Sequence, residues 1–242
     1  KSLVVYPDDL FETVKWHDGS PLSAGDFVMN MILSFDPGKT ESKMYDEALA
    51  LSINATLSAF KGYRIVSTDP LTIEAYSDTY NTNAELNILT LWPQDLYGLG
   101  YENSWPVLAV SNLAEVNGEL AYSEDKAGAL EVEQTNWVGG PSLEVLGKYL
   151  DQAATESHIP YAATMSQFVT KEEADLRYAN LKQWVADHGH YMVGTGPYYL
   201  DQAFTTEKSV VLKHFADFPD LADRWSQFSE PKLATTLLDG PG

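Results

Sequence analysis

The stretch VKWHDGSPLSAGDFV, residues 14–28, combines a turn, a helix cap and the start of an apolar helical face. Asp18-Gly19 is a turn dipeptide, and Ser23 followed by Asp26 three residues later has the form of a helix-capping pair. Apolar residues then recur at three- and four-residue spacing as far as Phe35. The pattern predicts a helix that starts after Ser23, buries one face and ends at the Asp-Pro-Gly breaker that follows.

Further along the chain the hydrophobic period changes from helical to two-residue. A second helix is expected over about 45–60, and alternating apolar residues from Tyr63 to Ala75 predict a β-hairpin around Thr68-Asp69-Pro70. A second strand pair is expected over 198–202 and 209–214, after a turn at Gly194-Thr195-Gly196-Pro197. The fold class predicted is therefore α/β, with mixed helices and strands.

Between the two strand pairs the sequence is mostly helical. Helices are expected over 106–117, 142–154 and 171–187, the last opened by a Thr170/Glu173 capping box and closed by Gly189. Two apolar stripes predict that these helices pack on each other or on the sheet. The stripes are Leu143, Leu146, Leu150 and Ala153, and Ala174, Tyr178, Leu181 and Val185.

Composition excludes several classes of function. The 242 residues carry 15 Lys plus Arg against 35 Asp plus Glu, a net charge of −20, which disfavours nucleic acid and anionic membranes as partners. The chain has no cysteine, so disulfides, thiolate metal sites and cysteine nucleophiles are excluded. No apolar run approaches the roughly 18 residues that span a bilayer.

The two ends of the sequence predict an excised piece of a longer protein. Lys1 is not an initiator Met, no signal-like apolar stretch follows it, and residues 237–242 form a breaker cluster. We therefore expect that a targeting segment has been removed.

Motifs for metal, nucleotide or catalytic sites are weak. His188-Gly189-His190 could share a metal ion but has no third ligand at a recognisable spacing, and Gly189 fits better as a helix end. The Gly194 turn lacks the third glycine of a phosphate loop, and Pro197 removes a backbone donor. No G-x-S-x-G, H-E-x-x-H or GK[ST] motif occurs. The sequence names no metal ligand, no cofactor and no catalytic residue.

Aromatic residues are the best candidates for ligand contact. The chain has 6 Trp, 14 Tyr and 9 Phe, and core packing is the default role for each of them. Trp92, Tyr97, Tyr101 and Trp105 differ because they lie in a segment interrupted by Pro and Gly, where ligand contacts tend to occur. These four residues are the predicted ligand-binding set.

Residues 14–28 closely resemble the signature of family 5 extracellular solute-binding proteins, the group of oligopeptide, dipeptide and nickel receptors. Two weaker similarities follow in the family's order: the hairpin Gly62–Tyr76, and Gly194-Thr195-Gly196-Pro197-Tyr198-Tyr199-Leu200, which is similar to a G-T-G-P-Y turn. The 214–225 segment agrees only loosely with an N-P-x-Y-W pattern, and the stretch 105–190 is longer than the family pattern requires.

The resemblance implies one lobe of a two-lobed type II periplasmic-binding-protein fold. Residues 1–104 would hold the signature and hairpin, 105–190 a helical elaboration of the same lobe, and 191–242 return strands and a linker toward a second lobe. It further implies a non-enzymatic receptor for a small solute, most simply a peptide, that hands its cargo to the permease of an ABC importer. Such receptors are extracellular or periplasmic and contact the membrane only through a removed anchor or the importer.

The signature residues themselves are expected to be structural. Trp16 offers apolar surface, Asp18 and Gly19 turn the chain, and Ser23 and Asp26 cap the helix. The residues Gly194, Gly196 and Pro197 are expected to form the second turn of the motif.

Two alternatives remain open. One is a hydrolase on a borrowed fold, which needs two carboxyl groups with separated pKa values in one cleft. The other is a protein-docking module, which needs a large exposed apolar patch on the helices of 105–190.

Overall fold

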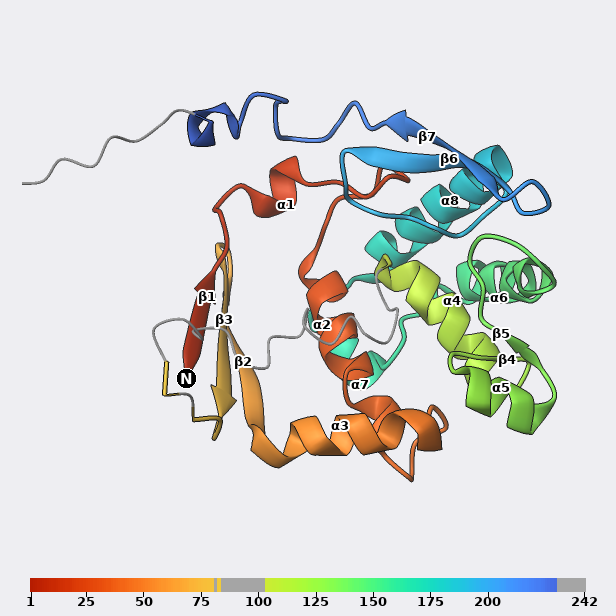
Figure 1. The fold of residues 1–242 in the computed structure, drawn as a ribbon, viewed down its shortest axis with the longest axis horizontal. Helices are drawn as coiled ribbons and strands as arrows, with labels where there is room; N and C mark the ends of the chain where they lie inside the picture. The colour runs from red at the N-terminus through yellow and green to blue at the C-terminus, as the bar shows by residue number, and fades with distance from the viewer. Residues whose placement is uncertain (81, 84–102, 230–242) are drawn as a thin grey trace, which may run out of the picture.

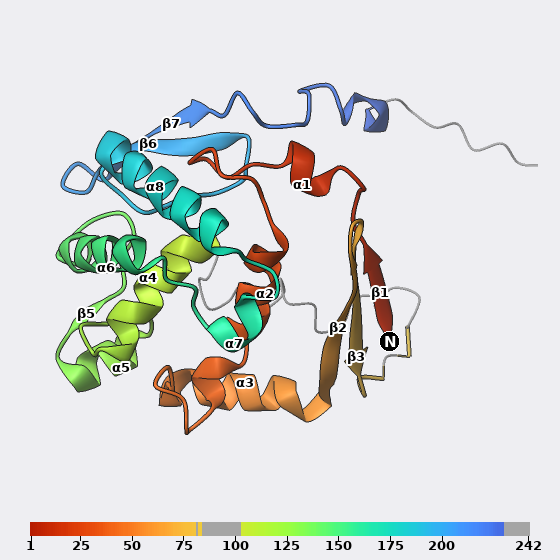
Figure 2. The same cartoon turned by 180° about the vertical axis from the view of Figure 1, so that it is seen from behind.

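The structure is a computed structural model that describes residues 1–80, 82–83 and 103–229, and it is mixed α and β (Figure 1). A small antiparallel sheet forms one side, and a group of helices forms the centre and the other side. A β-hairpin lies across the helices at one end, as the opposite view also shows (Figure 2). The α/β class predicted from the sequence is confirmed.

The N-terminal sheet has strand order β1-β3-β2, with every pair antiparallel. Its inner face buries Leu71, Ile73 and Ala75 against Met31. The predicted hairpin is confirmed, while the third strand, at the N-terminus, was not predicted. The strands are β1 (Ser2–Val5), β2 (Phe60–Thr68) and β3 (Leu71–Ser77).

The first helices follow the sequence pattern closely. After a single turn, α1 (Leu10–Thr13), the signature helix α2 spans Ala24–Leu33 and begins with the predicted capping box of Ser23 and Asp26. A 3₁₀ turn, η1 (Asp36–Gly38), ends this segment at the predicted breaker, and α3 (Glu47–Ala59) leads into β2.

The central helices enclose the main core. Leu146, Leu150 and Ala153 of one predicted stripe and Ala174, Tyr178 and Leu181 of the other are buried, and Leu143 and Val185 are partly buried beside them. Both stripes are therefore confirmed. The elements are α4 (Trp105–Val116), β4 (Leu120–Ala121), α5 (Glu124–Leu130), β5 (Glu133–Gln134), α6 (Ser142–Glu156), α7 (Ala162–Met165) and α8 (Lys171–His188).

The α4 helix lies at the middle of this core. Ten of its twelve residues are buried, and it packs on α2, α6 and α8. A helix surrounded in this way needs apolar or small residues on all sides, which is why its sequence, WPVLAVSNLAEV, has no regular polar face.

The second strand pair is also confirmed. The strands β6 (Tyr198–Phe204) and β7 (Ser209–His214) pair antiparallel beside α8 (Figure 1). All six residues of β7 are exposed. A last 3₁₀ turn, η3 (Ser226–Phe228), closes the described chain.

Among the described residues, no helix combines the length and apolar character needed to cross a bilayer.

The helix end at Gly189 gives a test of local structure. Gly189 caps α8 with φ +72°, a left-handed conformation in which a Cβ is strained. We predict that Gly189→Ala lowers the free energy of unfolding by about 1 kcal/mol. The matched change Gly128→Ala, on the exposed face of α5 where a Cβ meets no neighbouring atom, should instead raise it by up to about 1 kcal/mol. Urea denaturation of both variants measures the difference, and equal destabilisation would contradict this account.

Candidate functional site

Two segments that are distant in the sequence meet at His17. The His17 amide donates to Gly194 O at 2.8 Å, His17 Nδ1 accepts from the Gly194 amide at 3.1 Å, and His17 Nε2 lies 2.9 Å from Gly196 O. A neutral imidazole with its proton on Nε2 satisfies both ring contacts. His17 therefore binds the signature loop to the Gly194–Pro197 turn.

The close contact explains one glycine of the turn. A Cβ built on Gly194 would lie 3.1 Å from His17 Cε1 and 3.4 Å from His17 Nδ1, so a side chain would push the imidazole away. The sequence predicts a turn at Gly194, Gly196 and Pro197 before a strand; in the structure residues 196–197 form a bend, and β6 begins at Tyr198. The role of His17 was missed, because nothing in the sequence pairs a histidine with a glycine so far away.

Aromatic rings from α8, β6 and the residue after β7 lie around His17. The His17 ring lies 4.9 Å from the Phe215 ring, 6.2 Å from Trp184 in a stacked arrangement and 5.9 Å from Tyr199, measured between centroids. Burial among these groups lowers the pKa of His17 below its ordinary value, against the weaker opposing effect of the Gly196 hydrogen bond.

The turn after His17 has the predicted form. The Asp18 carboxylate accepts from the Ser20 amide at 2.9 Å, and Gly19 has φ +83°. The Gly19 amide donates to Trp16 O at 2.9 Å, and the Trp16 amide donates to Ser20 O at 2.8 Å, so the loop is closed on itself. Burial raises the pKa of Asp18, partly offset by its hydrogen bonds with Ser20.

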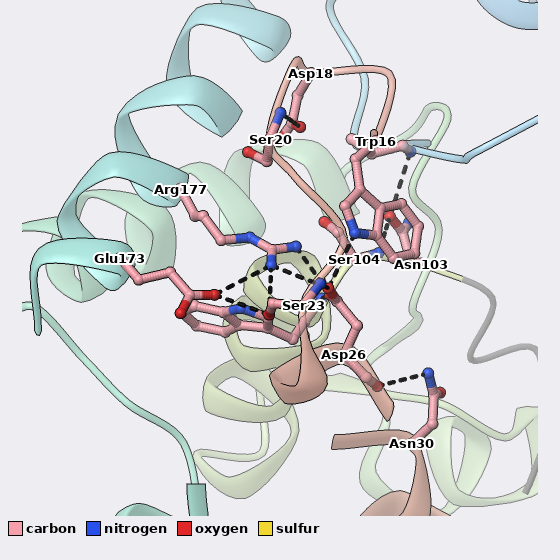
Figure 3. Close-up of polar contacts among 12 residues, drawn as sticks. Trp16, Asp18, Ser20, Ser23, Asp26, Asn30, Asn103, Ser104, Glu173 and Arg177 are labelled. Atoms are coloured by element: carbon pink, nitrogen blue, oxygen red, sulfur yellow. Dashed lines mark hydrogen bonds and ion pairs between the residues drawn. The ribbon is translucent and has the colours of Figure 1, made fainter. Parts of the chain in front are cut away.

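Below the loop, Asp26 is the centre of a buried polar network (Figure 3). Its Oδ2 accepts from Trp16 Nε1 at 3.1 Å and from the Ser23 amide at 3.0 Å, and its Oδ1 accepts from the Trp105 amide at 3.0 Å. Both oxygens also accept from the Arg177 guanidinium, at 2.8 and 3.0 Å. One carboxylate thus connects the loop, α2, α4 and α8.

The Arg177 side chain is fully buried, which is exceptional for arginine. In addition to Asp26 it contacts Glu173 Oε1 at 3.4 Å, and the same oxygen accepts from Ser23 Oγ at 2.9 Å. The Thr170 half of the predicted cap on α8 is present, with Oγ1 accepting from the Glu173 amide at 3.1 Å. The Glu173 carboxylate reaches across to α2.

The predicted ligand-binding residues fall into two groups. Trp92, Tyr97 and Tyr101 lie outside the described residues. Trp105 is 0% exposed. The centroid of its ring lies 5.5 Å from that of the Tyr178 ring and 5.4 Å from Arg177 Cζ. The structure thus places Trp105 in the core, because the first residue of α4 sits where α2 and α8 meet.

Asn103 was not predicted, yet it holds the approach to the Gly194 turn. It is 1% exposed; its Nδ2 donates to Tyr191 O at 2.9 Å, and its Oδ1 accepts from the Ser104 and Val193 amides. This buried amide joins the start of α4 to the segment before Gly194. An asparagine in a loop gives no sequence signal for such a contact.

A cavity of about 540 Å³ opens where these pieces meet. Asn30, Thr195 and the peptide groups of the turn supply uncharged hydrogen-bonding atoms, and Trp16 and Tyr198 supply aromatic surface. None of its described lining residues is an acid, a lysine or an arginine. The candidate site is therefore suited to an uncharged polar group. The full lining is Trp16, His17, Asn30, Asn103, Gly194, Thr195, Gly196 and Tyr198.

The His188-Gly189-His190 segment has backbone partners. His190 Nε2 lies 2.9 Å from Leu200 O, and His190 Nδ1 accepts from the Met192 amide at 3.1 Å. His188 Nδ1 lies 3.5 Å from Asp201 Oδ1. Among the described residues, no three His, Cys, Asp or Glu side chains are placed to hold a metal ion.

The carboxyl groups whose pKa values burial raises are not brought together. Asp18 lies beside α8, whereas Glu115 sits near the end of α4 and bonds with Lys126 Nζ at 2.5 Å and the Tyr122 amide at 2.7 Å. This arrangement gives no support to a hydrolytic acid–base pair formed by these two groups.

Comparison with protein-family models finds none that matches the chain. Comparison with curated protein sequences likewise finds no match.

The buried ion pair predicts a large stability effect. Arg177→Met should lower the free energy of unfolding by about 3 kcal/mol or more, because it leaves Asp26 buried with its charge unpaired. The matched surface change Arg224→Met, which removes an exposed pair with Asp220, should cost no more than about 1 kcal/mol. If chemical denaturation shows equal losses of unfolding free energy for the two variants, the buried pair contributes no more to stability than the surface pair.

The environment of His17 predicts a pH effect. The pKa of His17 is lower in the folded protein than in the unfolded chain. As pH falls below about 6.5, the unfolded chain therefore takes up the proton first. The free energy of unfolding decreases from that pH down to the pKa of the folded protein. Burial acts in the same direction on the pKa values of His158 and His190. The raised pKa values of Asp18 and Glu115 act in the opposite direction, so the difference between two proteins isolates the contribution of His17. From pH 7.5 to 5.5, the stability of His17→Gln should change less in the destabilising direction than that of the wild type. Identical pH slopes in urea titrations would contradict the inference.

Proposed function

We propose that this chain is the binding lobe of a solute-binding receptor that serves an ABC importer. The observation that carries the proposal is the three-bond contact between His17 and the Gly194–Gly196 turn, which forms the wall of the 540 Å³ cavity. The two joined segments are the same two whose sequences resemble family 5 solute-binding proteins.

A binding wall has to be rigid before the ligand arrives, since ordering it on binding reduces affinity. Here the Asp26–Arg177 network holds the loop, and Asn103 holds the segment before the turn. The cavity wall is thus supported from beneath by buried hydrogen bonds.

The chemistry of the wall favours a neutral hydrogen-bonding solute. The Asn30 amide, the Thr195 hydroxyl and the peptide groups of the turn suit the amides of a short peptide, and Tyr198, which is 60% exposed, offers a flat surface to its side chains. A peptide backbone is the ligand class that fits best.

The mechanism we propose is capture by lobe closure. In a type II periplasmic-binding-protein fold, a second lobe closes over the ligand, and the ligand shifts the open–closed equilibrium by its higher affinity for the closed form. Under this proposal the protein acts outside the cytoplasmic membrane, and its partner is the permease of the importer. No catalytic residue is required.

The docking alternative draws less support from the helices. On α5 and α8 the exposed large apolar residues are Leu130 and Leu176, one on each helix. Exposed apolar residues gather instead on the β6–β7 hairpin, at Tyr198, Val210 and Leu212. The hairpin follows directly from the cavity wall, so its exposed face fits a surface that meets another part of a receptor.

The test is ligand binding followed by amide NMR on this 242-residue chain. Among trialanine, maltotriose, spermidine and Ni²⁺, trialanine should give saturable shifts centred on Gly194, Thr195 and Gly196. Tyr198→Ala and Asn30→Ala should weaken binding severalfold by removing contact surface and a hydrogen bond.

The control is Tyr80→Ala, the same change at an 86% exposed position outside the cavity, which should leave binding unchanged. No saturable shift with any of the four classes, or turnover of a peptide or glycoside substrate, would reject the receptor proposal.

A further inference from the structure

A second cavity, of about 490 Å³, lies between η1, the loop that follows it, α4 and the segment before α7. It shares no lining residue with the cavity beside His17. Its size falls within the range typical of small-molecule sites. Met44, Ala109, Leu113, Val116 and Pro160 form apolar walls.

Two of the four acidic and basic residues on the cavity wall, Asp36 and Lys39, pair with each other. Asp36 Oδ2 accepts from Ser42 Oγ at 2.8 Å and from the Tyr161 hydroxyl at 2.7 Å, and Lys39 Nζ lies 3.8 Å from Asp36 Oδ1. These contacts hold the Asp36 carboxylate in the cavity wall. They also satisfy much of its hydrogen bonding and charge, so it attracts a cationic ligand less strongly.

Asn112 on α4, unlike Asp36, has a buried polar atom without a hydrogen-bond partner in the described part of the chain. It lines the cavity, is only 6% exposed, and its Oδ1 accepts from the Tyr122 hydroxyl at 2.8 Å. Its Nδ2 has no hydrogen-bond partner among the described residues. A buried amide donor left unpaired is costly, so an acceptor atom brought in by a ligand would relieve that cost.

The remaining electrostatics favour an uncharged ligand. Glu41 and Lys43 also lie on the cavity wall, so with Asp36 and Lys39 its formal charges balance. The net charge of −20 on the whole chain opposes an anion. His158 also lines the cavity and is half-buried; burial lowers its pKa, so the imidazole adds no positive charge at neutral pH. The cavity thus combines apolar walls with one unsatisfied donor, and the two acids on its wall are matched in number by two lysines.

We propose that this cavity binds a small, uncharged, mostly apolar molecule through a carbonyl oxygen that accepts from Asn112 Nδ2. The apolar body of the ligand packs against Met44, Leu113 and Val116. The site is independent of the solute-binding proposal, because it uses different residues and a different ligand chemistry.

The experiment uses three probes that differ only in the polar group: acetophenone, ethylbenzene and benzoate. Titrations of the ¹⁵N-labelled 242-residue chain at pH 7.5 should show acetophenone shifting the amides of 109–116 and the Asn112 side-chain amide. One hydrogen bond worth about 1 kcal/mol should make acetophenone bind about fivefold more tightly than ethylbenzene. Benzoate should bind more weakly than acetophenone.

Two variants locate the site. Asn112→Asp keeps the acceptor for Tyr122 but removes the donor, so it should abolish the preference for acetophenone over ethylbenzene. Val116→Phe, at a half-buried position on the cavity wall, should block all three probes and does not depend on the Asn112 network. The matched control Asn54→Asp, on the exposed face of α3, should bind like the wild type.

Four results would overturn the proposal. The first is acetophenone binding that does not shift residues 109–116. The second is full binding by a folded Val116→Phe variant. The third is benzoate binding more tightly than acetophenone, which would reject the uncharged ligand class. Shifts at Gly194–Gly196 instead would place the probe in the other cavity, and this outcome also counts against the proposal while leaving the receptor function intact.

Discussion

The buried ion pair between Asp26 and Arg177 is the constraint on which the rest of the structure depends. Removing two charges from water is expensive, and good ion-pair geometry together with further hydrogen bonds offsets that cost. Here Asp26 accepts from Trp16, Ser23, Trp105 and both terminal nitrogens of Arg177. These demands determine where the signature loop, α4 and α8 lie relative to α2, because a shift of any one would leave a buried polar atom unpaired.

The candidate site follows from that arrangement. With Trp105 held at the start of α4, the preceding Asn103 is in place to bond the segment 191–193, and the Gly194 turn comes next. His17, on the loop held by Asp26, then meets the turn from the other side. The cavity wall is thus built from loops, yet each loop is fixed by a buried polar contact, as preorganised binding requires.

The two cavities differ in the chemistry of the groups that line them. The cavity beside His17 is lined by side-chain amides, a hydroxyl and peptide groups. It therefore offers several weak contacts to uncharged groups. The cavity beside α4 is mostly apolar and contains one unpaired buried donor. The first suits a solute that arrives and leaves, whereas the second suits an apolar molecule held by burial and a single hydrogen bond.

What the sequence determined by itself was local. The capped start of α2, the Asp18-Gly19 turn, both strand pairs and the end of α8 at Gly189 each arise from residues within a few positions of one another, so periodicity and turn chemistry predict them. Only the tertiary structure decided which side chains meet. Asp26 and Arg177 are 151 residues apart, and His17 and Gly194 are 177 apart, and no local rule pairs them. For the same reason Trp105, chosen from its loop context, lies in the core: burial depends on the whole path of the chain.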